Sequence, residues 1–325
     1  MKKTFLYFCL LFIVQTAFAA DSLYVREQQI PILIDRIDNV LYEMRIPAQK
    51  GDVLNEITIQ IGDNVDLSDI QAIRLFYSGV EAPSRKGEHF SPVTYISSHI
   101  PGNTRKALES YSVRQDEVSA PLSRTVKLTS KQPMLKGINY FWVSIQMKPE
   151  TSLLAKVATT MPNAQINNKP IDITWKGKVD ERHVGIGVRQ AGDDGSAAFR
   201  IPGLVTTNNG TLLGVYDIRY NSSVDLQEKI DIGVSRSTDK GQTWEPMRVA
   251  MTFKQTDGLP HGQNGVGDPS ILVDEKTNTI WVVAAWTHGM GNERAWWNSM
   301  PGMTPDETAQ LMLVKSEDDG KTWSE

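Results

Sequence analysis

The octamer S-T-D-K-G-Q-T-W at residues 237–244 recurs as S-E-D-D-G-K-T-W at residues 316–323. Both copies follow the pattern S-x-D-x-G-x-T-W, and each comes after an apolar run, at residues 230–234 and 311–314. Apolar alternation that ends in Ser, Asp and Gly predicts a strand entering a tight turn. Asp can accept backbone N–H bonds inside such a turn, and Gly supplies a positive φ. We expect each octamer to close a β-hairpin, with its Trp over the hairpin base and Thr-Trp starting the return strand.

A hairpin turn repeated at a spacing of tens of residues is typical of radially arranged sheets, because no single sheet there can bury both faces alone. In this respect the sequence resembles the Asp-box proteins, also called the bacterial neuraminidase repeat group. That group includes sialidases, other glycosidases and propellers without catalytic activity. The octamers themselves predict architecture only, since function has to be argued from a site.

The N-terminal residues 1–19 have the pattern of a secretory signal peptide. A positively charged start precedes an apolar stretch at residues 5–14, and A-F-A at residues 17–19 has the form of a cleavage site. A transmembrane anchor is the alternative, which the shortness of the apolar run disfavours. The only cysteine, Cys9, lies inside this segment, so the mature chain should have no disulfide and no thiolate metal site. The sequence therefore predicts a secreted or periplasmic protein, without a stable membrane span after signal cleavage.

Two β-rich units are expected after the signal. Residues 20–182 contain turn-rich stretches between candidate strands at 56–61, 72–77, 140–147 and 171–175. This unit has no octamer and predicts an antiparallel β-sandwich, with glycan binding or support of the second unit as its expected role. Residues 183–325 carry both octamers and short apolar strands at 212–216, 230–234, 280–285 and 311–314.

The second unit is short for a closed propeller. Four-stranded blades of about 50 residues would give it two to three blades, whereas propellers typically have four to eight. The predicted fold class is therefore all-β, a sandwich followed by the first blades of a propeller. We expect the sequence to be the N-terminal part of a longer protein.

Composition excludes several function classes. The formal net charge is −4, with 34 Lys and Arg against 38 Asp and Glu spread along the chain, so no nucleic-acid partner is expected. The sequence has no H-E-x-x-H motif, no P-loop and no cysteine cluster, and its five histidines lack metal-ligand spacing. We expect neither a cofactor nor a metal.

The segment F-R-I-P at residues 199–202 precedes the first octamer and carries the first chemical signal. Arg-Ile-Pro before the first blade, followed by octamers, resembles the bacterial exo-α-sialidases of glycoside hydrolase family thirty-three, over residues 185–325. The resemblance implies a six-bladed propeller and an arginine triad that holds the carboxylate of sialic acid, with Arg200 as its first member. A planar guanidinium suits that task because it makes two parallel charge-assisted hydrogen bonds to a carboxylate. A surface salt bridge is the structural alternative for Arg200.

The same resemblance implies roles for three further residues. Asp225 lies 25 residues after Arg200, where the family has its general acid/base, which protonates the leaving oxygen and then deprotonates water. Arg219 matches a second arginine that lines the sugar pocket, and Asp268 matches an aspartate that contacts the 4-hydroxyl. The structural alternatives are a solvated strand end for Arg219 and an ordinary Asp-Pro turn for Asp268. Asp217 is the rival to Asp225, and its other expected role is to orient neighbouring side chains.

The family uses a tyrosine nucleophile activated by a glutamate, which departs from the usual two-carboxylate scheme. The resemblance implies that these residues and the other triad arginines lie beyond Glu325, so residues 20–325 alone should be inactive. We predict a retaining exo-α-sialidase that acts on sialylated glycoproteins, glycolipids or oligosaccharides. The alternatives are a non-catalytic Asp-box propeller that binds glycans and a different Asp-box glycosidase. Arg-Ile-Pro together with Asp225 favours the first, since the octamers would serve all three.

Overall fold

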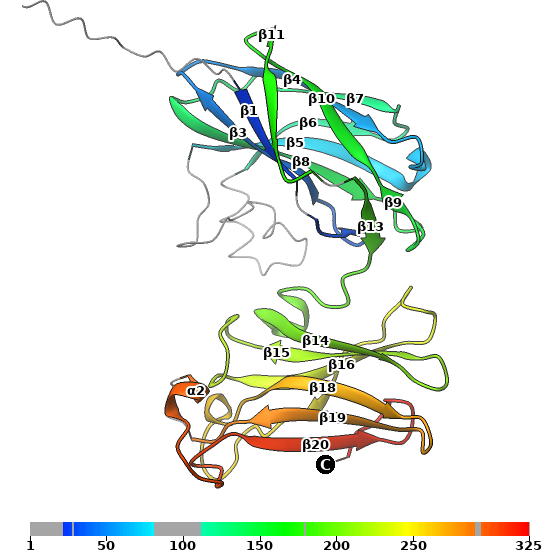
Figure 1. The fold of residues 1–325 in the computed structure, drawn as a ribbon, viewed down its shortest axis with the longest axis vertical. Coiled ribbons are helices and arrows are strands. Elements are labelled where there is room, and N and C mark those ends of the chain that lie inside the picture. The colour runs from blue at the N-terminus through cyan, green and yellow to red at the C-terminus, as the bar shows by residue number, and fades with distance from the viewer. Residues whose placement is uncertain (1–21, 28, 81–111, 179, 290–293, 325) are drawn as a thin grey trace, which may run out of the picture.

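The computed structural model describes residues 22–27, 29–80, 112–178, 180–289 and 294–324. Within these ranges the protein is all-β, as predicted, and Figure 1 shows two β-rich units joined by one stretch of chain. The helical segments described are single turns, at Leu67–Asp69, Asp193–Gly195, His261–Gln263 and α2 (Ala295–Asn298). Among the described residues there is no helix with the length and apolar character needed to span a membrane. The signal peptide predicted at residues 1–19 lies outside the described residues.

The described residues of the first unit form three sheets. The largest has six strands in the order β12 (Asp172–Lys176), β1 (Ser22–Arg26), β3 (Asn39–Ala48), β8 (Gly137–Met147), β5 (Ile70–Gly79) and β6 (Val113–Ser119). The second has four, in the order β11 (Lys169–Pro170), β10 (Thr159–Ile166), β4 (Leu54–Ile61) and β7 (Thr125–Thr129). A small third sheet contains β2 (Ile32–Leu33), β13 (Arg182–Gly185) and β9 (Lys156–Val157). All four strands predicted in this unit are present, as β4, β5, β8 and β12.

The core of the first unit lies between its two larger sheets. In β1, Leu23 and Val25 are fully buried while Tyr24 between them is 46% exposed, as expected of a half-buried strand. Ile57 and Ile59 of β4, from the facing sheet, belong to the same hydrophobic cluster. Burial of one face from each sheet is the packing of a β-sandwich.

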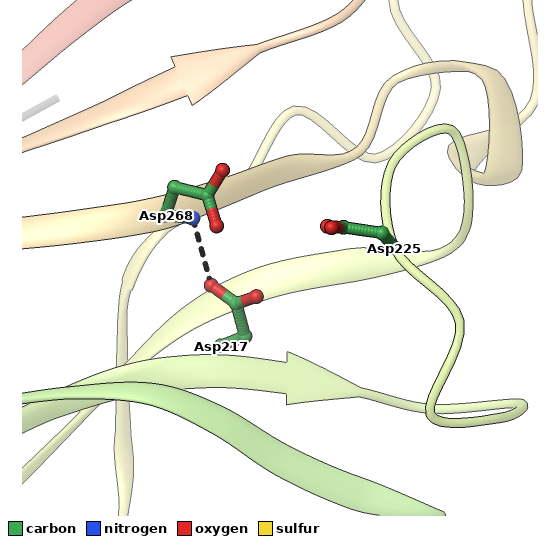
Figure 2. A group of neighbouring side chains, drawn as sticks. All are labelled: Asp217, Asp225 and Asp268. Carbon is green, nitrogen blue, oxygen red and sulfur yellow. Dashed lines mark hydrogen bonds between the residues drawn. The ribbon is translucent and has the colours of Figure 1, made fainter. Parts of the chain in front are cut away.

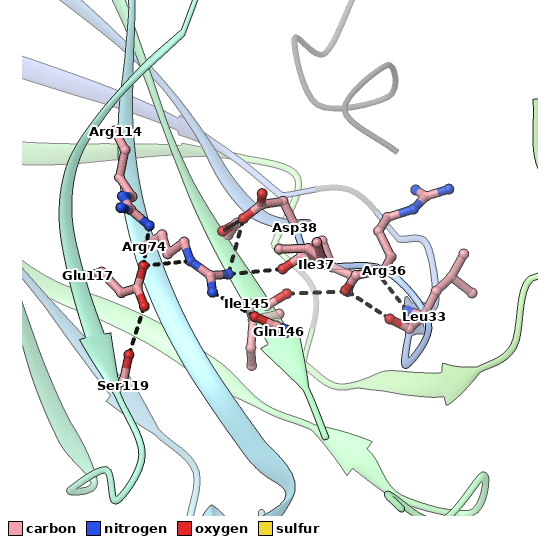
Figure 3. Close-up of polar contacts among 12 residues, drawn as sticks. Leu33, Arg36, Ile37, Asp38, Arg74, Arg114, Glu117, Ser119, Ile145 and Gln146 are labelled. Atoms are coloured by element: carbon pink, nitrogen blue, oxygen red, sulfur yellow. Dashed lines mark hydrogen bonds and ion pairs between the residues drawn. The ribbon is translucent and has the colours of Figure 1, made fainter. Parts of the chain in front are cut away.

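A buried arginine ties the larger sheet to the turn before β3. Arg74, in β5, donates to Glu117 Oε2 at 2.9 Å and to Gln146 Oε1 at 2.6 Å. It also donates to Ile37 O at 3.0 Å and lies 3.4 Å from Asp38 Oδ1 (Figure 3). A guanidinium can be buried here because its donors reach charged or carbonyl acceptors.

Two antiparallel sheets build the second unit. The first has the order β14 (Ala198–Thr206), β15 (Leu212–Arg219), β16 (Ile230–Ser237) and β17 (Arg248–Met251). The second has the order β18 (Val266–Asp274), β19 (Thr279–Trp286) and β20 (Gln310–Ser316), and β18 lies against β14, β15 and β16. The four strands predicted here are confirmed within β15, β16, β19 and β20. A blade count beyond these two sheets stays a prediction.

Both octamers follow the third strand of a sheet and form the same turn. Gly241 and Gly320 have φ of 86° and 78°, the left-handed conformation that the pattern predicts. The Thr243 N–H donates to Asp239 Oδ1 at 2.9 Å, and the equivalent bond in the second copy is also 2.9 Å. The hydroxyl and N–H of Thr243 lower the pKa of Asp239 to about 2, so the carboxylate stays ionised and holds the turn.

The return strand begins later than predicted. Thr243 is still held by Asp239 through its hydroxyl, at 2.5 Å, and Trp244 Nε1 donates to Gly241 O at 3.1 Å. These bonds keep both residues in the turn, and β17 starts only at Arg248. The Trp244 ring lies 3.6 Å from the position that a Cβ at Gly214 would occupy, so it lies beside β15, the strand next to this hairpin, and its cover of the hairpin base stays a prediction.

The second octamer also joins the two sheets of this unit. Asp319, at a variable position of the pattern, accepts from Thr211 Oγ1 at 2.6 Å and pairs with Arg236 Nη2 at 3.0 Å. Arg236 Nε also donates to Asp319 O at 2.7 Å. Because Arg236 lies in β16 of the first sheet and Thr211 directly precedes β15, the turn of one sheet is bonded to its neighbour.

Candidate active site

A β-bulge in β14 sets the position of Arg200. The ladder with β15 is interrupted between Arg200 and Gly203, and Ile201 at the bulge has φ of 53°. A positive φ is uncommon for a β-branched residue, so the surroundings must hold it. Bulges re-aim side chains. The Arg200 side chain is exposed, and its Nη1 donates to Ser223 O at 3.2 Å.

The first strand of the second sheet has the same irregularity. The β18–β19 ladder is interrupted between Gly267 and Ser270, and Asp268 at this bulge has φ of 56°. In both sheets the residue with positive φ directly precedes a proline. The bulge in the first sheet adjoins Arg200, and the bulge in the second sheet presents Asp268, which is exposed.

Arg219, at the end of β15, is the most enclosed of the predicted site residues. Its side chain is 0% exposed, and its Nε and Nη2 donate to Asp217 Oδ2 at 3.0 and 2.7 Å. Nη2 also donates to Asp225 Oδ1 at 3.1 Å, and Nη1 donates to Ser223 O at 3.1 Å. The guanidinium therefore lies between two carboxylates, and it shares the Ser223 carbonyl with Arg200.

Asp225 lies on the loop between β15 and β16. Its side chain is 28% exposed, and its Oδ1 accepts from Arg219 Nη2 and from the N–H of Leu226 at 3.0 Å. The segment leading into β18 approaches this loop closely at Gly265. A Cβ there would lie 2.2 Å from Glu228 O, a clash that explains why glycine occupies the position.

Three carboxylates converge at this end of the two sheets. Asp217, Asp225 and Asp268 each place an oxygen within 4.8 Å of the others (Figure 2). Burial raises the pKa of Asp217 to about 6, against the hydrogen bonds and charge of Arg219, which lower it. Burial and the charge of Asp225 raise the pKa of Asp268, and Arg219 and Arg200 oppose this. The two arginines, Arg200 and Arg219, supply the positive charge that offsets the negative charge of the three carboxylates.

The structure brings all four predicted site residues together. Arg200 and Arg219 meet at the Ser223 carbonyl, and Arg219 contacts Asp225. Their catalytic and binding roles stay predictions. Of the two candidates for the acid/base, Asp225 is partly exposed and Asp217 is fully buried, so Asp225 is the one that a substrate can reach. The Ser223 carbonyl was not anticipated, because a backbone acceptor has no signature in sequence.

Comparison with known proteins shows what the chain is similar to. Two family models match, the N-terminal domain of BNR-repeat neuraminidase at residues 20–170 and a BNR repeat-like domain at residues 201–325. A sialidase of Bacteroides fragilis is 56% identical over 330 residues, which cover 100% of this chain and 60% of that protein. The chain is a sialidase homologue. The resemblance inferred from Arg-Ile-Pro and the octamers is thereby confirmed.

Two further proteins are similar to this sialidase homologue over different shares of its length. A sialidase of Paraclostridium sordellii is 36% identical over 127 residues, covering 39% of this chain and 29% of that protein. A solved structure described as a Hadza microbial sialidase has a TM-score of 0.78 and 60% identity, covering 93% of this chain and 58% of that one. The sialidase homologue thus spans about 60% of the length of the curated relative that it matches from end to end.

Proposed function

We propose that the full-length protein is an exo-α-sialidase that removes terminal sialic acid from glycoproteins, glycolipids or oligosaccharides, with retention of configuration. The observation that carries this proposal is the convergence of two guanidinium groups on one carbonyl. Arg200 and Arg219 lie 3.2 and 3.1 Å from Ser223 O, beside the carboxyls of Asp225 and Asp268. A sugar with a carboxylate on its anomeric carbon needs a cation and a proton donor at the same place.

Each side chain has a defined task in this proposal. The exposed guanidinium of Arg200 binds the substrate carboxylate through charge-assisted hydrogen bonds. Asp225 protonates the leaving oxygen and then deprotonates water, a contribution of about 100- to 10,000-fold for a well-placed general acid/base. Arg219 holds the Oδ1 oxygen of Asp225, which leaves Oδ2 as the atom we assign to proton transfer. Asp268, exposed beside them, accepts from a sugar hydroxyl.

In this proposal, the remaining catalytic groups correspond to the part of the Bacteroides fragilis sialidase that this chain does not cover. Retention requires a nucleophile, and we assign it to a tyrosine with a glutamate partner, as in the sialidase scheme. An exposed apolar face on the second sheet is evidence for further blades in that part, which would cover it. Leu272 is 51% exposed, and Leu311 and Leu313 of β20 are 80% and 52% exposed on the same face of the second sheet.

The test is hydrolysis by the purified full-length protein. It should release sialic acid from an aryl α-sialoside and from at least one of the α-2,3, α-2,6 and α-2,8 linked oligosaccharides, with the α-anomer appearing first by NMR. Residues 20–325, prepared in the same way, should show no turnover. Absence of hydrolysis on every substrate would remove the enzyme proposal. Saturable glycan binding without turnover would instead support the non-catalytic propeller.

Export is part of the same proposal. A signal peptide at residues 1–19 would deliver the enzyme to the periplasm or the medium, where its glycoconjugate substrates are found. N-terminal sequencing of the protein recovered from those fractions should begin at Ala20. A mature protein that still begins at Met1 would contradict cleavage, and recovery in the cytoplasm alone would contradict export.

A further inference from the structure

Asp217 has no task in the mechanism above, yet it is the most buried carboxylate of the site. It lies in β15 directly across the ladder from Arg200 and is 0% exposed. A buried carboxylate is costly unless it is paired and hydrogen-bonded. The partners that offset this cost therefore indicate what the side chain is there to hold.

The two oxygens of Asp217 serve two different elements. Oδ2 accepts from Nε and Nη2 of Arg219, at 3.0 and 2.7 Å, within the same strand. Oδ1 accepts from the backbone N–H of Asp268 at 2.9 Å, which belongs to β18 of the neighbouring sheet (Figure 2). One side chain thus bonds a guanidinium in one sheet and the backbone of the next sheet.

The bond from Asp217 reaches the backbone of Asp268 at a strained position. Asp268 has φ of 56°, at the point where the ladder between β18 and β19 is interrupted. A non-glycine residue in this conformation costs about 1–3 kcal/mol and persists only where its surroundings hold it.

We propose that Asp217 is a positioning residue, whose carboxylate fixes the Arg219 guanidinium and the Asp268 backbone together and so sets the separation of Asp225 from Asp268. Arg219 passes this constraint to Asp225 through its 3.1 Å contact. The inference rests on the proposed function, because it assigns to Asp217 the alignment of groups that act on the sugar.

The charge of Asp217 matters for this role. The charged groups that face it are Arg219 on its own strand, Arg200 on β14, Asp268 on β18 and Asp225 on the adjoining loop. Burial raises its pKa to about 6, so the carboxylate is ionised above that pH and protonated below it. A protonated Asp217 loses its charge attraction for Arg219, and alignment should weaken as the pH falls through about 6.

The experiment compares Asp217→Asn with Asp217→Ala in the full-length protein, assayed on an aryl α-sialoside between pH 4 and pH 8. Asparagine keeps the shape and one acceptor for the Asp268 N–H but removes the charge. We expect kcat/KM at neutral pH to fall about tenfold for Asn and about 100-fold for Ala, the range expected for charge-assisted hydrogen bonds. In wild type, kcat/KM should fall as the pH drops through about 6, because Asp217 becomes protonated there. The Asn variant should lack this fall.

Asp231→Asn is the matched control. Asp231 is also a buried carboxylate, in the adjacent strand β16, but it bonds Tyr220 at 2.9 Å and His261 at 2.8 Å and makes no hydrogen bond or ion pair with Arg219 in the described part of the chain. A folded Asp231 variant should keep the wild-type pH profile. Thermal unfolding by circular dichroism establishes which variants are folded.

Each possible result either supports the positioning role of Asp217 or contradicts it. If folded Asp217 variants keep kcat/KM within twofold of wild type and an unchanged pH profile, the proposal is wrong. An Asn variant that cannot fold would overturn it too, because the carboxylate would then support the fold instead of the site. If wild type itself cleaves no sialoside, the proposed function has failed, and that result is read before any variant is compared.

Discussion

Replacing Asp225 by alanine in the full-length protein should lower kcat for a natural sialoside by about 100- to 10,000-fold. The side chain is 28% exposed on a loop and makes its inward bonds through one oxygen, so truncation should remove a proton donor without opening the core. The loss should be smaller on an aryl sialoside with an acidic phenol, since that leaving group needs less protonation. Steady-state kinetics on the two substrates measures both effects.

Glu228→Gln is the matched control, because Glu228 is a carboxylate on the same loop. It bonds Asn221 Nδ2 at 2.9 Å and the N–H of Lys229 at 2.8 Å. Its variant should keep kcat within about twofold, as expected for a change on the surface away from the reacting atoms. Equal losses for Glu228→Gln and Asp225→Ala would mean that loop conformation, not proton transfer, explains the result. A loss that does not depend on the leaving group would likewise argue against the acid role.

Replacing Arg219 by alanine should have the largest effect on stability. The guanidinium is 0% exposed and joins Asp217, Asp225 and the Ser223 carbonyl. Its loss leaves Asp217 buried without a counter-charge, and removing one partner of a buried pair costs about 3–5 kcal/mol. Activity should fall as well, since Asp225 loses the contact that orients it. Denaturant unfolding and sialoside kinetics on the same preparation measure the two consequences.

Arg200→Ala separates binding from stability. Arg200 is exposed and contacts the same carbonyl at 3.2 Å, so its loss should change the free energy of unfolding by less than about 0.5 kcal/mol. Its KM should rise by about 10- to 100-fold, because a charge-assisted bond to the substrate carboxylate is lost. The assignment of Arg219 would fail if Arg219→Ala unfolded at the same denaturant concentration as wild type.

Strand positions in the second unit were predictable because apolar alternation and turn chemistry are local. The octamers contain their own hydrogen-bonding partners, and Asp239 bonds Thr243 four residues away without help from elsewhere in the chain. The strand β3, in contrast, was not expected. Buried Met44 and Ile46 do alternate there with the outward Glu43 and Arg45, and Pro47 near its end is the residue that argues against a strand.

The members of the candidate site were predicted from the resemblance, and their connections were not. Arg200 and Asp225 carry the side chains that the proposed reaction would require, in the order that the resemblance implies. The Ser223 carbonyl, which receives both arginines, is a backbone atom that every residue possesses. Asp217 and Asp268 are 51 residues apart, and nothing in their separation indicates that one accepts the other's N–H.

The amino-acid pattern alone was enough to predict hairpins closed by S-x-D-x-G-x-T-W turns, because the bonds that the conserved Ser, Asp and Thr of each turn make lie within eight residues. The resemblance also predicted which side chains bind an anionic sugar, and that prediction awaits the experiments above. The enclosure of Arg219 between Asp217 and Asp225, and the bond that holds Asp268 across two sheets, became visible only in the folded structure. Those arrangements depend on how one sheet packs against the next, and long-range packing has no local signal in the order of the residues.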